Sequence, residues 1–196
     1  MEALLTALII LPGGYLAGSL PWAYFVTRVA KGFDIRTVGT GNAGAANVYK
    51  QVSPWAGILV LALDALKGAT VALVIQGAGL PEYSLFAGGM AVVIGHNWPA
   101  FLGFRGGKGL AVVFGVSLAV LPTWTIVALA LALAGGLATR NVLLGIAVGI
   151  VALNVLTIVT GQSDMQISMC LTMSALVVGT YFAVSYRKTT VFAPRR

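Results

Sequence analysis

The sequence predicts an all-α integral membrane protein, with seven transmembrane helices in a single membrane domain over residues 1–196. Hydrophobic residues make up 59% of the chain and charged residues only 9%, and the mean hydropathy is +0.96. These values are typical of membrane proteins rather than of soluble domains. Apolar segments recur along the chain, and about 20 residues are enough for a helix to cross the ~30 Å hydrocarbon core.

The first apolar segment, residues 1–26, is expected to remain as a membrane span and not to act as a signal peptide. It carries Glu2 and no basic residue at its start, and it continues through Gly18–Pro21 without a small-residue cleavage pattern. Six further segments are predicted at residues 54–76, 84–98, 109–121, 122–138, 141–160 and 165–186. Segments 84–98 and 109–121 are shorter than a full crossing, so we expect two short helices that flank a recess at the cytoplasmic face, or helices that use flanking polar residues for their ends.

Charge decides whether residues 109–138 form one helix or two. Only Pro122 interrupts them, and proline is tolerated within membrane helices. With seven spans and the N-terminus outside, eleven of the twelve Lys and Arg residues fall in cytoplasmic loops or in a cytoplasmic tail. A merged helix would send the tail cations outside, and it would be ~43 Å long for a ~30 Å core. The sequence therefore predicts two helices here and a cytoplasmic C-terminus.

Several kinds of function are disfavoured by composition. The net charge of +7 does not indicate nucleic-acid binding, because the cations stand at the ends of apolar segments, where they orient the protein or meet lipid headgroups. With one histidine and five acidic residues, no spacing predicts a metal site, and no cofactor is expected. Cys170 is the only cysteine, so it is expected to pack as a small hydrophobic residue.

Two polar, glycine-rich runs interrupt this apolar chain and are the candidate anion sites. The first is Gly39–Asn47, flanked by Arg36 and Lys50, where little side-chain bulk allows backbone N–H groups to approach a phosphate. The second is Gly95–Gly109, which holds His96, the only histidine, near Arg105, Gly106, Gly107 and Lys108. Both lie on the predicted cytoplasmic face, so we expect them to converge. His96 can serve in acid–base chemistry or can simply cap a helix end.

Two motifs of soluble proteins match these runs only in part. Gly39–Gly44 fits the dinucleotide fingerprint, with Asp64 twenty residues further on, but a membrane span precedes it where a strand is required. Gly103–Lys108 resembles a P-loop with one residue too few, and Gly109 stands where a Ser or Thr would hold magnesium. Neither a dehydrogenase nor an NTPase is predicted.

Asp64 and Lys67 carry opposite charges within the second span. They are three residues apart, so they lie on one helix face and are expected to pair. Two interpretations stay open for them, a structural ion pair and a role in orienting the preceding polar loop.

The order and spacing of these motifs over about the first 120 residues carry a family resemblance. Gly18-Ser19-Leu20-Pro21, Lys31–Arg36, Gly39–Asn47, Leu63–Gly68 and Gly95–Gly109 together resemble the bacterial membrane acyltransferases that acylate glycerol 3-phosphate from acyl phosphate, the PlsY family. The resemblance implies a seven-span fold in the bacterial inner membrane, with a cytoplasmic active site that makes 1-acyl-glycerol 3-phosphate and phosphate for phospholipid biosynthesis.

The resemblance also implies roles for individual residues. His96, Asn42 and Lys108 would be catalytic, with His96 orienting the nucleophile or helping to accept its proton. The residues that would bind the phosphates of the two substrates are Arg36, Thr40, Gly41, Gly44, Asn47, Lys50, Arg105, Gly106 and Gly107. For the asparagines a turn-closing role stays open, and for the cations a role as positive-inside anchors.

The chemistry agrees with these residue types. An acyl phosphate is already activated, so the protein mainly binds two phosphates, orients a hydroxyl and stabilises charge on the carbonyl oxygen. The His-x-x-x-x-Asp pair of thioester-dependent acyltransferases is absent, because Phe101 is the fifth residue after His96. No serine or cysteine stands with a convincing base, which favours direct transfer over an acyl-enzyme.

Other functions remain open because the chain departs from the family pattern. It has Thr40, Ala46, Lys50 and Leu143 where the family usually has Ser, Thr, Arg and Ser, and its tail over residues 186–192 has no His or Asn. An altered paralogue that binds lipid phosphate or regulates a partner is therefore one alternative. A small transporter is another, although the two similar halves that it predicts are not found in the sequence.

Overall fold

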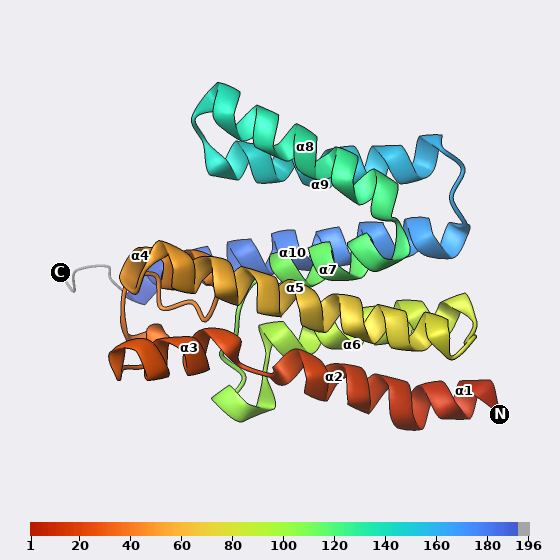
Figure 1. Cartoon of the computed structure of the whole chain (residues 1–196), viewed down its shortest axis with the longest axis horizontal. Helices are drawn as coiled ribbons and strands as arrows, with labels where there is room; N and C mark the ends of the chain where they lie inside the picture. Colours follow the sequence, from red (N-terminus) through yellow and green to blue (C-terminus); the bar gives the residue numbers. More distant parts are fainter. Residues whose placement is uncertain (192–196) are drawn as a thin grey trace.

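The structure is a computed structural model that describes residues 1–191, with side chains described through residue 184. Over these residues it contains helices and no strand (Figure 1). The elements are α1 (Glu2–Leu5), η1 (Thr6–Ile10), α2 (Leu11–Ser19), α3 (Trp22–Lys31), η2 (Ile35–Thr37), α4 (Ala45–Gln51), α5 (Pro54–Gly77), α6 (Glu82–Asn97), η3 (Ala100–Leu102), α7 (Leu110–Val120), α8 (Pro122–Thr139), α9 (Val142–Val159) and α10 (Asp164–Val191).

Six of the seven apolar segments each form one helix that begins within two residues of the expected start. The first segment is instead divided into α1, η1, α2 and α3, with a break at Leu20 and Pro21 that was not predicted from the sequence. Six helical segments within the described residues are long and apolar enough to cross a membrane. They are Glu2–Lys31, Pro54–Gly77, Glu82–Leu102, Pro122–Thr139, Val142–Val159 and Asp164–Val184. The seventh, α7, has only 11 residues, so one of the two expected short helices is confirmed. The other expectation is wrong, because α6 continues through η3 as a segment of 21 residues, Glu82–Leu102, that is long enough to cross.

The chain reverses at Pro122, as the charge argument predicts. Leu121 has φ −133° and ψ 59°, outside the helical region, and Pro122 occupies the first turn of α8. Proline is favoured at this position because its missing N–H group has no partner there in any helix. Figure 1 shows α8 running back from the end of α7, so residues 109–138 form two helices and not one.

The main core lies between α5, α6, α7 and α10. Its fully buried side chains include Val92, Val93, Val112, Val116 and Met173. Helices α5 and α7 approach so closely that a Cβ atom on Gly115 would overlap the carbonyl oxygen of Ala65. Small residues at such contacts are typical of helices that pack within a membrane.

Helices α8 and α9 form a hairpin that stands beside this bundle (Figure 1). The two helices pack through small residues, with Gly145 against the backbone of Gly136 and Gly149 against Ala132. A small cluster of Leu121, Ala128, Leu153 and Cys170 joins the hairpin to the bundle. Cys170 is buried and has no disulfide, so its packing as a small hydrophobic residue is confirmed.

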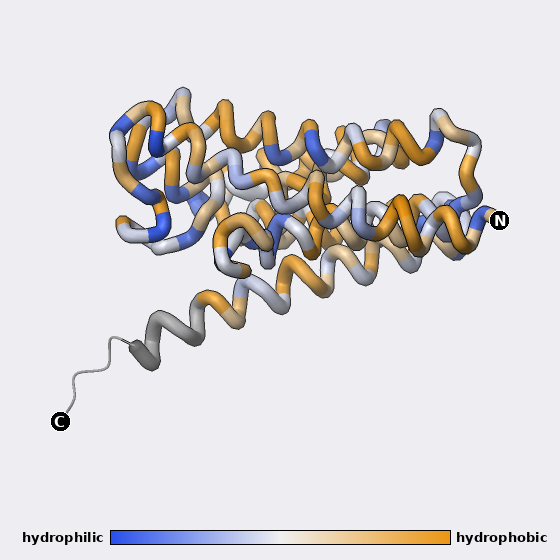
Figure 2. The backbone as a smooth tube through the Cα atoms, turned by 90° about the horizontal axis from the view of Figure 1, so that it is seen from below, coloured by the Kyte–Doolittle hydropathy of each residue, from blue (hydrophilic) through white to orange (hydrophobic). Residues whose placement is uncertain are grey.

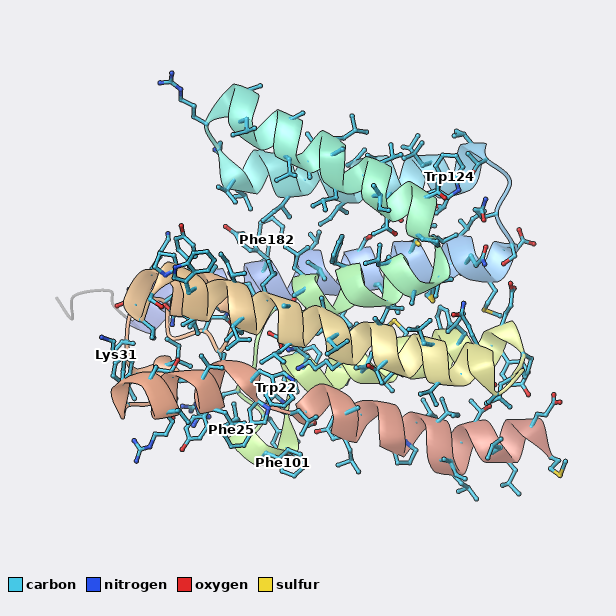
Figure 3. The ribbon with its side chains drawn as sticks, in the orientation of Figure 1. Trp22, Phe25, Lys31, Phe101, Trp124 and Phe182 are labelled. Carbon is cyan, nitrogen blue, oxygen red and sulfur yellow. The ribbon has the colours of Figure 1, made fainter. Side chains whose placement is uncertain are left out.

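Polar residues gather at one end of the molecule, opposite the N-terminus (Figure 2). This end holds the loops from α3 to α4 and from α8 to α9, and α10 also runs toward it (Figure 1). At the edge of the bundle near this end, Trp22 and Phe25 lie with ring centroids 6.4 Å apart, and Phe101 projects near them (Figure 3). Aromatic side chains of this kind favour the boundary between hydrocarbon and water.

Candidate active site

A break in the first long helix begins the site. Helix α2 ends at Ser19 and α3 begins at Trp22, because Leu20 takes an extended ψ of 115° before Pro21. The break leaves the carbonyl of Gly18 at the end of α2, and the carbonyl of Leu20 accepts only a hydrogen bond of 3.2 Å from the backbone N–H group of Trp22. Lys67 of α5 donates hydrogen bonds to both carbonyls, over 2.8 and 3.1 Å. A buried cation therefore holds the broken helix against α5.

Lys67 also belongs to a buried charged cluster. Its Nζ lies 3.0 Å from Oδ1 of Asp64, so the expected ion pair is confirmed. The same Nζ lies 2.9 Å from Nδ1 of His96 on α6, and Asp64 Oδ1 lies 3.5 Å from this nitrogen. The side chains of the three residues are between 3% and 7% exposed. The sequence predicted the pair but gave no sign of its contact with His96.

The Gly39–Asn47 run is organised by Asn47, which lies on α4 and is 2% exposed. Its Nδ2 lies 3.0 to 3.1 Å from the carbonyl oxygens of Ile35, Val38 and Asn42, and its Oδ1 accepts a hydrogen bond from the backbone N–H of Thr40. One side chain thus fixes the path of residues 35–42. Gly39 and Gly41 have φ values of 57° and 67°, which favour glycine.

The two polar runs converge, as predicted. Arg36 donates from Nη1 to the carbonyl oxygen of Leu102 over 2.6 Å, and the N–H group of Ala43 donates to the carbonyl of Gly106. The second run folds back onto the end of α6, because the N–H groups of Gly106 and Gly107 donate to the carbonyls of Asn97 and His96.

Gly107 comes very close to the imidazole of His96. A Cβ atom on Gly107 would overlap Nε2 of His96, and one on Gly106 would overlap the carbonyl oxygen of His96. The paired glycines therefore allow the loop to lie directly on His96. Both glycines also line a small pocket of about 10 Å³, together with Asp64 and His96.

A larger cavity, of about 550 Å³, is also lined by these two glycines. Its size is within the range of small-molecule sites in proteins. It is lined by Arg36, Thr37, Val38, Gly39, Thr40, Gly41, Asn42, Asn97, Trp98, Phe104, Arg105, Gly106, Gly107, Thr180, Ala183 and Val184. Arg36 and Arg105 are on this described wall and no Asp or Glu is, although Asp34 pairs with Arg36, so the wall has a net positive charge and favours an anion.

Seven of the twelve candidate site residues line this cavity: Arg36, Thr40, Gly41, Asn42, Arg105, Gly106 and Gly107. His96 lines the small pocket behind the glycines. Four do not line either space. Gly44 precedes α4 as its N-cap, Asn47 is turned into the loop, and Lys50 is exposed on α4. Lys108 places its Nζ 4.1 Å from the ring centroid of Tyr181 on α10.

Sequence reasoning missed several residues of the cavity wall. Thr180, Ala183 and Val184 come from α10, and no local motif there marks them. Asn97 directly follows His96, and it is 4% exposed with no hydrogen-bond partner for Oδ1 or Nδ2 among the described residues. Oδ1 of Asn42 is also buried without a partner there. Such groups are normally satisfied by water or by a ligand.

Of the positions at which the chain departs from the family pattern, Thr40 lines the cavity, whereas Ala46, Lys50 and Leu143 do not. Ala46 is exposed on α4, and Leu143 stands at the start of α9 and is 47% exposed. Neither lines the cavity. The side chains of the tail over residues 186–192 lie outside those that the structure describes.

Asp34 and Arg36 form an ion pair that fixes the arginine in the cavity wall. Nε and Nη2 of Arg36 donate to the carboxylate, with Nη2 2.7 Å from Oδ2. These side-chain hydrogen bonds hold the pKa of Asp34 below its ordinary value. The side chains are about a quarter exposed, so water weakens the pair.

Asp34→Asn is expected to lower stability at neutral pH by up to about 1 kcal/mol. Because the pKa of Asp34 is lower in the folded state, its stabilisation is complete above the unfolded pKa and is lost as pH falls through the folded pKa. The difference in Tm between parent and variant in detergent should thus be constant down to about pH 5 and shrink below about pH 4. A difference that stays constant to pH 3 would contradict this account.

The fold and the site define a multi-pass helical membrane protein with a basic, glycine-lined cavity near one end of its bundle. The profile of the family described as Glycerol-3-phosphate acyltransferase matches residues 8–190. The chain therefore belongs to the glycerol-3-phosphate acyltransferase family.

Individual relatives agree with this assignment. Glycerol-3-phosphate acyltransferase 4 of Dehalococcoides mccartyi (strain CBDB1) is 39% identical over 150 residues, which are 76% of this chain and 64% of that relative. The matched chain thus spans a little under two thirds of the relative's length.

Two crystal structures of PlsY (YgiH), an integral membrane glycerol 3-phosphate acyltransferase, are similar over nearly the whole chain. The glycerol 3-phosphate form has a TM-score of 0.84 and 32% identity, and covers 97% of this chain and 95% of that one. The lysophosphatidic acid form has a TM-score of 0.80 and 31% identity, and covers 96% and 94%. The present chain is accordingly an integral membrane protein.

Proposed function

We propose that this protein transfers an acyl group from acyl phosphate to the 1-hydroxyl of glycerol 3-phosphate, giving 1-acyl-glycerol 3-phosphate and phosphate. The observation that carries the proposal is the cavity of about 550 Å³, whose wall has Arg36, Arg105 and two glycine-rich loops but no carboxylate among its described residues. Such a wall suits phosphate groups. The glycerol 3-phosphate and lysophosphatidic acid forms of the similar PlsY structures support this choice of acceptor and product.

The reaction needs little covalent help from the protein. The glycerol hydroxyl attacks the carbonyl carbon of acyl phosphate, and the bond from that carbon to the phosphate oxygen breaks. The phosphate leaves with the bonding electrons, and a phosphate oxygen can take the hydroxyl proton. No described cysteine, histidine or carboxylate lines the large cavity to form an acyl-enzyme with a base. Binding, orientation and charge stabilisation remain as the contributions of the protein.

The residues can be divided between the two phosphates. Thr40, Gly41 and Asn42 lie on one wall of the cavity, and Gly106 and Gly107 lie on another, with Arg36 and Arg105 also on its wall. In our proposal one loop holds the glycerol phosphate and the other holds the acyl phosphate, with His96 and Lys108 flanking the second loop. Asn47 builds the first loop and does not itself touch a ligand.

We propose further that the cavity faces the cytoplasm of a bacterial inner membrane, with the N-terminus outside. The loops that carry Arg36, Lys50 and Arg140 lie near the polar end of the bundle, which the positive-inside tendency assigns to the cytoplasm (Figures 1 and 2). Substrates that are made in water would reach the cavity from that side.

A phosphate-release assay tests the proposed function. Purified protein in detergent is given acyl phosphate and glycerol 3-phosphate, and both phosphate and lysophosphatidic acid are measured. Lys108→Ala and Asn42→Ala should each lower kcat/KM by about 10- to 100-fold, the value of a hydrogen bond to a charged group. Gly13→Ala is the matched control, since a Cβ atom there meets nothing within 4 Å.

Each outcome of this assay has a clear meaning. Release of phosphate that depends on glycerol 3-phosphate supports the proposal. No release, with glycerol 3-phosphate still bound in calorimetry, would support the altered paralogue instead. Parent-like rates in both alanine variants would show that the assigned residues are wrong even if the activity is right.

A further inference from the structure

The buried cluster of Asp64, Lys67 and His96 has a function that the proposed reaction alone does not assign. We propose that Lys67 is a positioning residue that fixes the tautomer of His96, so that its proton is on Nε2 and points toward Gly107 and the phosphate-binding loop. This inference deepens the proposed function and rests on it for its catalytic consequence. The tautomer itself can be tested whether or not the protein is active.

The contacts of Lys67 set the tautomer. Its Nζ lies within 3.1 Å of four groups, namely the carbonyl oxygens of Gly18 and Leu20, Oδ1 of Asp64 and Nδ1 of His96. An ammonium group only donates hydrogen bonds. The ammonium has three protons for these four groups, so at least one proton is shared, but it cannot accept a hydrogen bond from a ring N–H group. Nδ1 at 2.9 Å therefore turns its lone pair toward Lys67, and a neutral imidazole in this arrangement carries its proton on Nε2.

The opposite tautomer is disfavoured by the same geometry. With the proton on Nδ1, His96 could donate to Asp64, but that distance is 3.5 Å and is longer than a good hydrogen bond. The N–H group would also face the ammonium of Lys67 at 2.9 Å. The carboxylate is engaged more closely by Lys67, at 3.0 Å. The lysine, and not the carboxylate, therefore makes the closer contact that orients the histidine.

The consequence appears on the other side of the imidazole. Nε2 has no hydrogen-bond partner among the described residues, and it faces Gly107, where a Cβ atom would overlap it. Gly106 and Gly107 line both the small pocket, which His96 and Trp22 also line, and the large cavity. Trp22 lies beside the break between α2 and α3 (Figure 3). In this tautomer His96 presents an Nε2–H donor to the loop of Gly106 and Gly107, which also lines the large cavity, and Nε2 cannot take a proton.

The protein is well suited to a direct test because His96 is its only histidine. Protein labelled with ¹⁵N in histidine would give a single pair of imidazole nitrogen signals in detergent. Nε2 is identified by its couplings to both ring protons, and Nδ1 by its strong coupling to Hε1 alone. We expect the protonated signal at Nε2 and the unprotonated signal at Nδ1. A proton on Nδ1, or a mixture of tautomers, would overturn the inference.

Substitutions at Lys67 and Asp64 test whether Lys67 orients His96 or only packs against it. Lys67→Met removes the donor to Nδ1, and the spectrum should change to a mixture or to the Nδ1–H form. Asp64→Asn keeps Lys67, so the Nε2–H form should persist. Because Lys67→Met leaves a buried carboxylate unpaired, the double variant Asp64→Asn with Lys67→Met is made beside it. An unchanged tautomer in a folded protein without Lys67 would contradict the proposal.

Kinetics then connects the tautomer to the reaction. In an active parent, loss of Lys67 should lower kcat by about 10²-fold, the effect of one lost oxyanion donor, with a much smaller change in KM. A KM effect alone would contradict a positioning role. If the parent releases no phosphate, the proposed function fails, and the ¹⁵N spectrum still decides the tautomer.

Discussion

Gly107→Ala is expected to lower kcat/KM by about 10³-fold while leaving the protein folded. The added methyl group would overlap Nε2 of His96. The imidazole has no easy way to move aside, because Lys67 holds its Nδ1 at 2.9 Å. Either the loop is displaced from the cavity wall or the histidine loses its fixed orientation, and both changes misplace groups that we assign to the substrate.

The effect of this substitution should come from contact and not from backbone strain. The φ angle of Gly107 is not positive, whereas Gly109, two residues further on, has a φ of 83°. Alanine is therefore compatible with the backbone at position 107. The assay is phosphate release, with thermal unfolding followed in parallel and Gly13→Ala as the control. Activity within threefold of the parent would show that close contact between the loop and His96 is not needed.

A second version of the experiment tests why the contact matters. If Gly107→Ala acts through His96, then adding His96→Ala to it should cause little further loss, because the two substitutions damage one unit. If the losses multiply instead, the methyl group acts on the cavity wall by itself. This double-variant cycle separates the two routes by which the loop could fail.

The helices could be predicted from the sequence because membrane spans obey a simple length rule. Runs of apolar residues gave bounds close to those of α5 to α9, and Pro122 with the charge pattern separated α7 from α8. The meeting of the two polar runs also followed from topology, since both were placed on the same face. These predictions use only the lengths of the apolar segments and the distribution of charge along the chain.

The roles within the site could not be predicted in the same way. An asparagine in a glycine-rich run is equally compatible with a ligand donor and with a loop organiser. Asn47 is the second kind because three carbonyls from residues 35–42 converge on it, and no local pattern encodes that convergence. Lys67 and His96 are likewise 29 residues apart and meet only through helix packing. The cation Lys50 is exposed on α4 and does not line the cavity.

Asn47→Ala is expected to damage stability and activity together. The substitution removes the amide that lies within 3.1 Å of three carbonyl oxygens and the acceptor for the N–H group of Thr40. At 2% exposure, water cannot replace these bonds without opening the loop. The expected cost is about 2–3 kcal/mol of unfolding free energy, with a loss of kcat/KM of about 10²-fold as Thr40 and Asn42 move.

Asn42→Ala and Asn47→Asp are the matched comparisons for this prediction. Asn42 lines the cavity, so its truncation should lower activity with little change in Tm. Asp at position 47 keeps an acceptor for Thr40 but replaces the donors with a carboxylate oxygen that faces three carbonyls, so it should destabilise at least as much as alanine. If Asn47→Ala instead keeps the parent Tm and loses only activity, Asn47 binds substrate directly and the loop is held by other contacts. A parallel fall in Tm and activity, absent in Asn42→Ala, would assign the two asparagines of the same glycine-rich run to different tasks.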